Sequence, residues 1–195
     1  MADRQAVFLD RDGTLIHDVG YPRDPAEVEL LPGVVQALHL LHKRGMALVV
    51  ISNQSGIGRG LLTDDDLTRV HNRLVQVLAQ HGVKLDGAYY CPHAPWERCA
   101  CRKPHPGLLH RAAEELDLDL ADSFMVGDKW SDVAAGHQAG CRTVLLRNRA
   151  NPMETPPRKL DRTSDMIVPD LLAATYWILS QVHANEGSKE DKRVN

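Results

Sequence analysis

The sequence contains no long hydrophobic run and no excess of basic residues. Its longest apolar stretches are residues 46–51 and residues 171–179, far shorter than the ~18–20 residues of a membrane-spanning helix. The first ten residues, MADRQAVFLD, carry charges and lack the apolar core of a secretory signal peptide. The 23 basic and 26 acidic residues give a net charge of −3, which disfavours nucleic-acid and membrane-surface partners. We therefore predict a cytoplasmic protein, whose charge balance still allows a local basic pocket for a phosphorylated small molecule.

Cysteine is also scarce, with four in 195 residues, but three of them lie close together. In a reducing cytoplasm such a cluster favours metal binding or catalysis over disulfide formation. The pairs Cys91-x-His93 and Cys99-x-Cys101 offer three thiolates and one imidazole, which suit a closed, tetrahedral Zn²⁺ site. This segment has no helical or strand pattern, so a metal would hold it in one shape; free thiols are the alternative. Cys141 stands apart and is expected to be a small buried residue.

Apolar blocks with the spacing of strands alternate along the chain with blocks that have the spacing of helices. Strands are predicted at residues 6–9, 46–52, 88–90, 123–126, 142–146 and 166–168. Helices are predicted at residues 32–45, 63–82, 106–116, 131–140 and 171–182. This order predicts an α/β fold with a mostly parallel sheet and helices on both faces, in one domain over residues 1–185. Residues 148–158 are expected to form a loop, and the polar residues 186–195 a disordered tail.

Polar residues follow four of the predicted strands, at the edge where α/β folds bind ligands. Asp10 and Asp12 are two apart at the first strand end, so an extended chain would project both to the same side. Adjacent carboxylates need a cation or a shared proton, which fits a nucleophilic carboxylate, a neighbouring acid and a divalent ion. Asp128 offers a further oxygen for Mg²⁺. An Asp-Gly turn is the alternative for the first pair, and a helix-dipole contact is the alternative for Asp132.

Ser52 and Lys103 are candidates to hold a phosphate, because a hydroxyl donates to phosphoryl oxygens and lysine is a compact positive charge. A helix cap is the alternative for Ser52, and a solvated surface side chain is the alternative for Lys103. Side chains able to bind a second phosphate or sugar hydroxyls lie nearby in the chain: Arg102, Lys129, Asn53 and Gln54.

In chain order, these residues resemble the four motifs of the haloacid dehalogenase (HAD) phosphatase superfamily. The motifs are Asp10-Arg11-Asp12-Gly13-Thr14, Ser52-Asn53, Lys103, and Gly127-Asp128 with Asp132, and the resemblance covers residues 5–147. The finer resemblance is to the D-glycero-D-manno-heptose 1,7-bisphosphate 7-phosphatase subfamily. It rests on residues 8–14, 52–60, 101–107 and 127–129. The related histidinol-phosphate phosphatases share the Asp-x-Asp motif, the metal loop and Arg-Lys-Pro, and they remain the alternative.

The resemblance implies a three-layer, Rossmann-like fold and a two-step reaction. Asp10 would attack phosphorus and form an aspartyl-phosphate, while Asp12 would protonate the leaving oxygen and then activate water. Ser52 and Lys103 would hold the phosphoryl oxygens. Mg²⁺ would bind the Asp10 carboxylate, the main-chain oxygen of Asp12, and Asp128. The subfamily also carries a zinc loop, here residues 91–101.

The substrate implied by the resemblance is D-glycero-D-manno-heptose 1,7-bisphosphate, which would lose its 7-phosphate in nucleotide-heptose and lipopolysaccharide core biosynthesis. The implied substrate-binding residues are Asp18, Tyr21, Ser52, Asn53, Gln54, Ser55, Arg102, Lys103 and Lys129. Residues 15–31 are too few to fold as a cap domain, so the site should be open. A zinc-stabilised, non-catalytic binding module is a second alternative. We expect a monomer, and the sequence does not indicate which anomer is bound.

Overall fold

The computed structural model describes residues 4–147 and 164–191, with side chains described as far as residue 182. Its six strands are β1 (Ala6–Leu9), β2 (Ala47–Asn53), β3 (Gly87–Cys91), β4 (Phe124–Gly127), β5 (Arg142–Leu146) and β6 (Met166–Val168). Its α-helices are α1 (Val34–Lys43), α2 (Asp64–Gln80), α3 (Gly107–Leu116), α4 (Trp130–Ala139) and α5 (Leu171–Asp191), and Pro25–Glu27 form the 3-10 helix η1.

The strands form one parallel sheet in the order β3-β2-β1-β4-β5-β6. The chain builds outward from β1 to β3, returns to place β4 on the other side of β1, and then builds toward β6. The order therefore reverses between β1 and β4. Leu9 pairs with Val50 on one side and Val126 on the other, so the three central strands end side by side. This edge is where parallel α/β sheets bind ligands.

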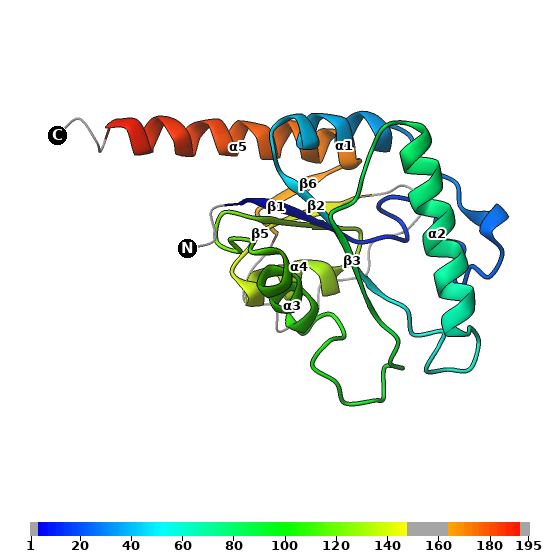
Figure 1. The fold of residues 1–195 in the computed structure, drawn as a ribbon. Helices are drawn as coiled ribbons and strands as arrows, with labels where there is room; N and C mark the ends of the chain where they lie inside the picture. The colour runs from blue at the N-terminus through cyan, green and yellow to red at the C-terminus, as the bar shows by residue number, and fades with distance from the viewer. Residues whose placement is uncertain (1–3, 148–163, 192–195) are drawn as a thin grey trace.

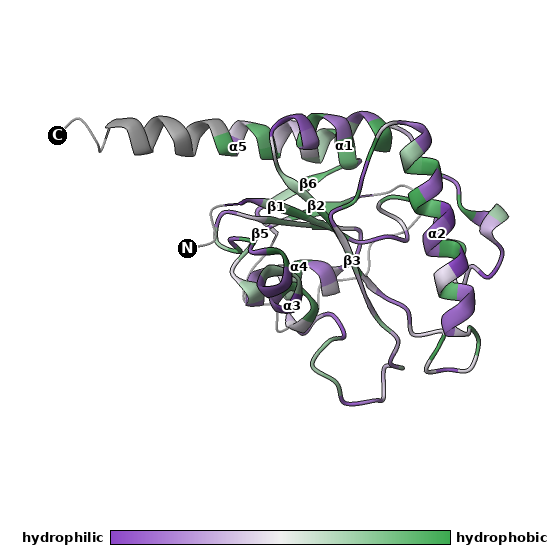
Figure 2. Cartoon of the chain, viewed as in Figure 1, coloured by the Kyte–Doolittle hydropathy of each residue, from purple (hydrophilic) through white to green (hydrophobic). Residues whose placement is uncertain are grey.

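Two hydrophobic cores lie on opposite faces of the sheet, because successive strand side chains point to opposite faces. Val7 and Leu9 of β1 belong to the core under α1, α2 and α5, while Ala6 and Phe8 belong to the core under α3 and α4. Figure 1 shows α1 and α5 on one side of the sheet and α3 and α4 on the other. In α2, hydrophobic and hydrophilic residues alternate along the helix (Figure 2), as expected for a helix that covers one face of a core. The predicted three-layer α/β architecture is confirmed.

The predicted elements lie within one or two residues of the observed ones, with one exception at the C-terminal end. Helix α5 continues to Asp191, well past the predicted end at residue 182 and into the segment predicted to be disordered. The predicted loop at residues 148–158 and the last four residues lie outside the described part of the chain. Between β1 and α1 only η1 forms, so no folded cap is inserted there. Among the described helices, none is long and apolar enough to cross a membrane.

Candidate active site

The catalytic candidates meet at the carboxyl ends of the central strands. Asp10 directly follows β1, and its N–H donates to the Val126 carbonyl of β4 at 3.0 Å. Ser52 is the second-to-last residue of β2, and Asp128 directly follows β4. Lys103 arrives from the loop after β3. The fold thus brings together four residues that the sequence analysis selected separately.

Lys103 is the centre of a buried ion-pair cluster. Its Nζ lies 3.0 Å from Asp10 Oδ1 and 2.7 Å from Asp132 Oδ1, and it donates to the Ile51 carbonyl at 2.6 Å. Only 3% of Lys103 and 1% of Asp132 are exposed to solvent. The alternative of a solvated surface lysine is therefore wrong, and Asp132 does more than face a helix dipole.

The charges in this cluster shift the pKa values of Lys103 and Asp10. Burial lowers the pKa of Lys103, but the charges of Asp10 and Asp132 outweigh it and hold the pKa above its ordinary value. Burial raises the pKa of Asp10, yet the positive charges of Lys103 and Lys129 bring it below the usual range. Asp10 is therefore an ionised carboxylate at neutral pH, which is the form that acts as a nucleophile.

Oxygen ligands for a hard cation converge beside this cluster. One carboxylate oxygen from each of Asp10, Asp128 and Asp132 lies within 4.8 Å of the others. Gly13 makes this approach possible, because a Cβ there would lie 2.4 Å from Asp128 Oδ2, and its φ of +82° suits glycine. Carboxylate oxygens are the donors that Mg²⁺ prefers, so the side chains fit the predicted ion. The main-chain oxygen of Asp12 as a ligand stays a prediction.

The Asp12 carboxylate belongs to a buried polar network with Arg11 and Gln54. Both of its oxygens accept hydrogen bonds from Arg11, and Oδ2 also accepts one from Gln54 Nε2 at 2.9 Å. The same Gln54 nitrogen lies 3.0 Å from Ser52 Oγ. Burial raises the pKa of Asp12 above its ordinary value, although the Arg11 guanidinium opposes the shift. A carboxyl group with a raised pKa is suited to act as a general acid.

Asn53 connects two motifs through the backbone. Its Nδ2 donates to the Lys103 carbonyl, and its Oδ1 accepts from the Lys103 N–H, both at 3.0 Å. This reciprocal pair fixes the backbone that carries the buried lysine. Contact of Asn53 and Gln54 with sugar hydroxyls stays a prediction, since both amides are engaged inside the protein.

The other predicted substrate-binding residues lie in the loops that follow β1, β2, β3 and β4. Lys129 Nζ lies 3.1 Å from Asp18 Oδ2, which joins the loop after β4 to the loop after β1. Tyr21 packs over Gly56, where a Cβ would lie 2.7 Å from its ring. Ser55, in the loop that follows β2, is half-buried, and Arg102 donates to the His93 carbonyl at 3.2 Å. The contacts of these residues with substrate stay predictions.

The Cys/His segment folds into a second ligand cluster. The Sγ atom of Cys91 lies 3.7 Å from that of Cys99 and 3.0 Å from that of Cys101, and His93 Nδ1 lies 3.2 Å from Cys101 Sγ. All four cysteines of the chain are free, and Cys141 is buried elsewhere. Ligand atoms within 4.8 Å of one another suit a tetrahedral ion bonded to sulphur at about 2.3 Å. The donor set and its spacing therefore fit Zn²⁺.

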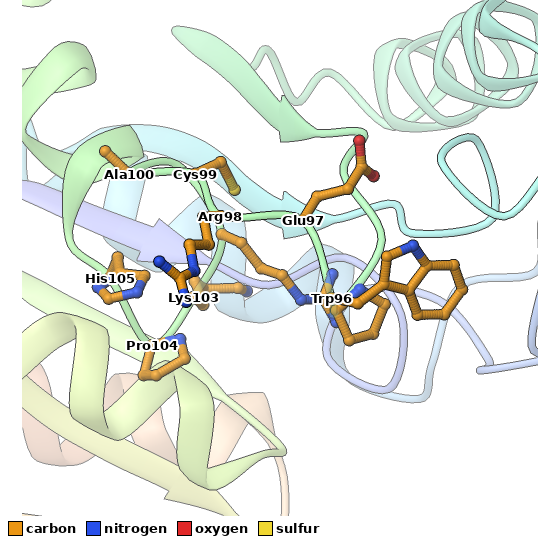
Figure 3. Close-up of a pocket in the computed structure, with 10 residues that line it drawn as sticks. Trp96, Glu97, Arg98, Cys99, Ala100, Lys103, Pro104 and His105 are labelled. Carbon is orange, nitrogen blue, oxygen red and sulfur yellow. The ribbon is translucent and has the colours of Figure 1, made fainter.

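A cavity of about 720 Å³ opens between the Cys/His segment and Lys103. Figure 3 shows Lys103 within it, with Trp96 at one end and His105 at the other. Trp96 is 69% exposed, and the Arg59 guanidinium lies 5.4 Å from the centre of its ring. The cavity is lined by the basic residues Arg98, Arg102 and Lys103 together with Trp96, Glu97 and His105.

The sequence analysis assigned no role to two charged residues that the fold buries here. Arg11 was quoted only as part of a motif, although it is buried and forms two hydrogen bonds with Asp12. Asp132 was left with an undecided role, although it neutralises Lys103. A signal existed for Arg11, since an arginine among the apolar and acidic residues at a buried strand end requires a partner.

Comparison with known proteins agrees with this site. A family of HAD-hydrolase-like proteins matches residues 100–174. The D-glycero-beta-D-manno-heptose-1,7-bisphosphate 7-phosphatase of Escherichia coli K12 is 40% identical over 184 residues, covering 91% of this chain and 89% of the relative. The corresponding protein of Salmonella typhi is 43% identical over 155 residues, covering 76% and 82%.

Comparison with solved structures also finds heptose 1,7-bisphosphate phosphatases. The D,D-heptose 1,7-bisphosphate phosphatase of B. bronchiseptica, complexed with magnesium and phosphate, superposes with a TM-score of 0.75 at 32% identity, over 91% of this chain and 99% of that one. The enzyme of Burkholderia thailandensis superposes with a TM-score of 0.62 at 28% identity, over 91% and 99%.

The parallel sheet, the aspartates after β1 and the buried lysine define a HAD-like hydrolase. Within that class, the chain belongs to the D-glycero-beta-D-manno-heptose-1,7-bisphosphate 7-phosphatase family. The family resemblance seen in the sequence is thereby confirmed, and the protein is a sugar bisphosphate phosphatase by class.

Proposed function

We propose that this protein removes the 7-phosphate of D-glycero-β-D-manno-heptose 1,7-bisphosphate, in a Mg²⁺-dependent reaction that leaves heptose 1-phosphate. The observation that carries the proposal is the buried Asp10–Lys103–Asp132 cluster beside Asp128, in a chain that belongs to this family. A scaffold without catalysis would have no reason to bury these charges at a ligand-binding edge. The product would serve nucleotide-heptose and lipopolysaccharide core biosynthesis.

In the first step, an oxygen of Asp10 forms a bond to phosphorus as the bond from phosphorus to the sugar oxygen breaks. Asp12 gives its proton to that departing oxygen. Lys103 already lies 3.0 Å from Asp10, so its ammonium is placed to hold an oxygen of the incoming phosphoryl group. The Ser52 hydroxyl, at the neighbouring strand end, is placed to donate to another.

In the second step, water forms the new bond to phosphorus and the bond from phosphorus to Asp10 breaks. Asp12, now ionised, accepts the proton of the water, so the side chain returns to its starting state. The net change is hydrolysis of one phosphate ester. Mg²⁺ held by Asp10, Asp128 and the main-chain oxygen of Asp12 would offset the negative charge of the phosphoryl group.

The remainder of the substrate would occupy the cavity beside Lys103. The Arg102, Arg98 and His105 side chains line that cavity, and a second phosphate needs such cationic or hydrogen-bonding partners. Lys129 stands across the mouth, held by Asp18. The chain carries a net charge of −3, so attraction of a bisphosphate depends on these local cations.

We also propose that the cluster of Cys91, His93, Cys99 and Cys101 binds Zn²⁺ as a structural ion. Cys101 lies two residues before Lys103, so a fixed cluster holds the backbone that carries the phosphate-binding lysine. The ion would have no open position for a water, since the protein supplies four ligands. The monomeric state and the cytoplasmic location stay predictions, to be checked by sedimentation and by fractionation of cells.

Measurement of phosphate release from four compounds tests the proposed activity. The panel contains the α and β anomers of the heptose 1,7-bisphosphate, heptose 1-phosphate and histidinol phosphate, each with and without Mg²⁺. We expect the highest kcat/KM for the β bisphosphate, phosphate loss from position 7 by phosphorus NMR, and no release without Mg²⁺. Faster release from histidinol phosphate would favour the related phosphatases. Release from none of the compounds would favour a binding module.

A further inference from the structure

Arg11 is the largest fully buried side chain among the described residues, and the reaction steps above do not use it. It lies between Asp10 and Asp12 in the chain, with 1% of its surface exposed. A buried guanidinium is costly unless its N–H groups find acceptors. The position of its partners therefore shows what the side chain does in the folded protein.

The guanidinium of Arg11 donates two hydrogen bonds to the Asp12 carboxylate. Nε lies 3.0 Å from Oδ1, and Nη2 lies 2.9 Å from Oδ2. Nη2 also donates to Gln54 Oε1 at 3.0 Å, while Gln54 Nε2 donates back to Asp12 Oδ2 at 2.9 Å. The three side chains form a closed ring of contacts, so the orientation of each depends on the other two.

A tight turn allows adjacent side chains to meet in this way. The N–H groups of Leu15 and Ile16 both donate to the Arg11 carbonyl, at 2.9 and 3.1 Å. The chain therefore curls directly after β1, and the side chains of residues 11 and 12 do not diverge as they would in a strand. The contact is a property of this turn and of the residues packed against it.

The far side of the guanidinium is also held. It lies 5.9 Å from the centre of the Tyr90 ring in β3, and the Tyr90 hydroxyl lies 2.9 Å from His71 Nδ1 in α2. The His71 and Tyr90 rings meet edge to face at 5.6 Å. The Tyr90 ring of β3, itself held by His71 of α2, therefore limits the orientation of the guanidinium. In that orientation Nε and Nη2 of Arg11 face the Asp12 carboxylate.

We propose that Arg11 is a positioning residue for the acid–base step: it holds the Asp12 carboxylate in one orientation, against the Gln54 amide that also contacts Ser52. The inference rests on the proposed function, because it assigns Asp12 the proton transfers. Without the fork, the Asp12 side chain would explore other rotamers, and proton transfer to the leaving oxygen and from water would slow. Arg11 itself touches no reacting atom.

Replacement by methionine, Arg11→Met, tests the inference with two substrates of different leaving-group chemistry. Heptose 1-phosphate departs from the bisphosphate as an alkoxide and needs a proton, whereas 4-nitrophenolate departs from 4-nitrophenyl phosphate as a stable anion and needs little help. We expect kcat for the sugar to fall roughly 10- to 100-fold. We expect the pre-steady-state burst of nitrophenolate to stay within about threefold of the wild-type rate, followed by slow turnover, because only hydrolysis of the aspartyl-phosphate still needs Asp12. Arg69→Met, a change of an exposed arginine on α2, should alter neither rate.

Equal loss of the burst rate and of sugar turnover would overturn the inference, as would an unchanged kcat. A double-mutant cycle supplies an independent measurement: in an Asp12→Asn background, Arg11→Met should lower kcat by less than about threefold, and a full additional loss would contradict the proposal. If the methionine variant does not fold, Arg11→Lys keeps the charge without the fork and should show the same split.

If the proposed function is wrong, the same assays give a result that differs from failure of the Arg11 inference. Wild-type protein would then leave the heptose bisphosphate unchanged, while the burst and the slow phase with 4-nitrophenyl phosphate would still report on Arg11. Wild-type protein inactive on both compounds would overturn both proposals.

Discussion

The two ligand clusters of this protein differ in how the fold holds them. The oxygen cluster brings Asp10, which follows β1, together with Asp128 and Asp132, which lie more than 100 residues later at the junction of β4 and α4. The sulphur cluster takes all its ligands from residues 91–101, most of which form no regular structure. The sheet therefore places the oxygen ligands, whereas the sulphur ligands depend on contacts within their own segment.

The two clusters also differ in how their charges are balanced. In the oxygen cluster, Lys103 pairs with two carboxylates, so much of its charge is balanced by the chain itself. In the sulphur cluster, burial raises the pKa of the Cys91 thiol, and no cationic side chain pairs with it among the contacts of the cluster. A metal ion has to displace those protons and then supplies the missing charge. We therefore expect loss of Mg²⁺ to stop turnover and loss of Zn²⁺ to destabilise the fold.

Asp10→Asn should have the largest effect on turnover, because it removes the nucleophile and leaves the shape of the oxygen cluster nearly unchanged. We expect kcat to fall on the order of 10⁴-fold or more. A melting curve recorded on the same sample should still show one cooperative transition. Activity near the wild-type level would remove Asp10 from its role and place catalysis elsewhere.

Cys101→Ala should have the largest effect on stability. Loss of one ligand opens the zinc site, and we expect a fall in melting temperature of roughly 10 °C together with loss of bound zinc, measured by metal analysis. Cys141→Ala is the matched control, since that cysteine is buried outside the cluster and should leave the zinc content unchanged. Equal melting temperatures for the two variants would show that the cluster has no structural role.

Asp132→Asn should affect both properties at an intermediate level. It removes one of the two negative partners of buried Lys103, which is expected to cost about 2–4 kcal/mol of stability and to lower kcat by roughly 10- to 100-fold. Asp65→Asn on α2 is the control, because Asp65 is also an acid in the first turn of a helix but is exposed. If both variants behaved alike, a helix-dipole contact would be the whole role of Asp132.

Asp66→Asn should have the smallest effect, because the residue belongs to neither cluster. Hydrogen bonds from Thr63 lower the pKa of Asp66 from 3.8 to about 2. A lowered pKa stabilises the fold above the unfolded value, and the contribution is lost as the pH falls toward 2. The wild-type protein should therefore melt slightly above the variant at pH 6, and the two melting temperatures should converge on acidification. A gap that stayed constant would show that the charge of Asp66 is not its cause.

Local patterns were sufficient to predict the elements and to place polar residues at the strand ends. The apolar block at residues 6–9 and the acid after it placed Asp10 correctly at a strand end, because both signals are local in sequence. The observed α2, whose start carries a capping box of Thr63 and Asp66, begins one residue after the predicted start of the helix at residue 63.

Contacts that depend on the assembled fold could not be predicted. Lys103 meets Asp132 only because the loop after β3 and the start of α4 reach the same edge of the sheet. Arg11 meets Asp12 only because the chain curls after β1, and a strand pattern would separate them. Asn53 forms two hydrogen bonds with the backbone of Lys103, 50 residues further along the chain, and no spacing in the sequence indicates that.

The most direct test is to trap the phosphorylated enzyme. Wild-type protein mixed with the heptose 1,7-bisphosphate and Mg²⁺ is quenched in acid within one turnover, and its peptides are analysed by mass spectrometry. We predict one added phosphoryl group on Asp10, its absence from the Asp10→Asn variant, and release of phosphate at the rate at which the modification disappears. A phosphoryl group on another residue, or none while phosphate is released, would contradict nucleophilic attack by Asp10.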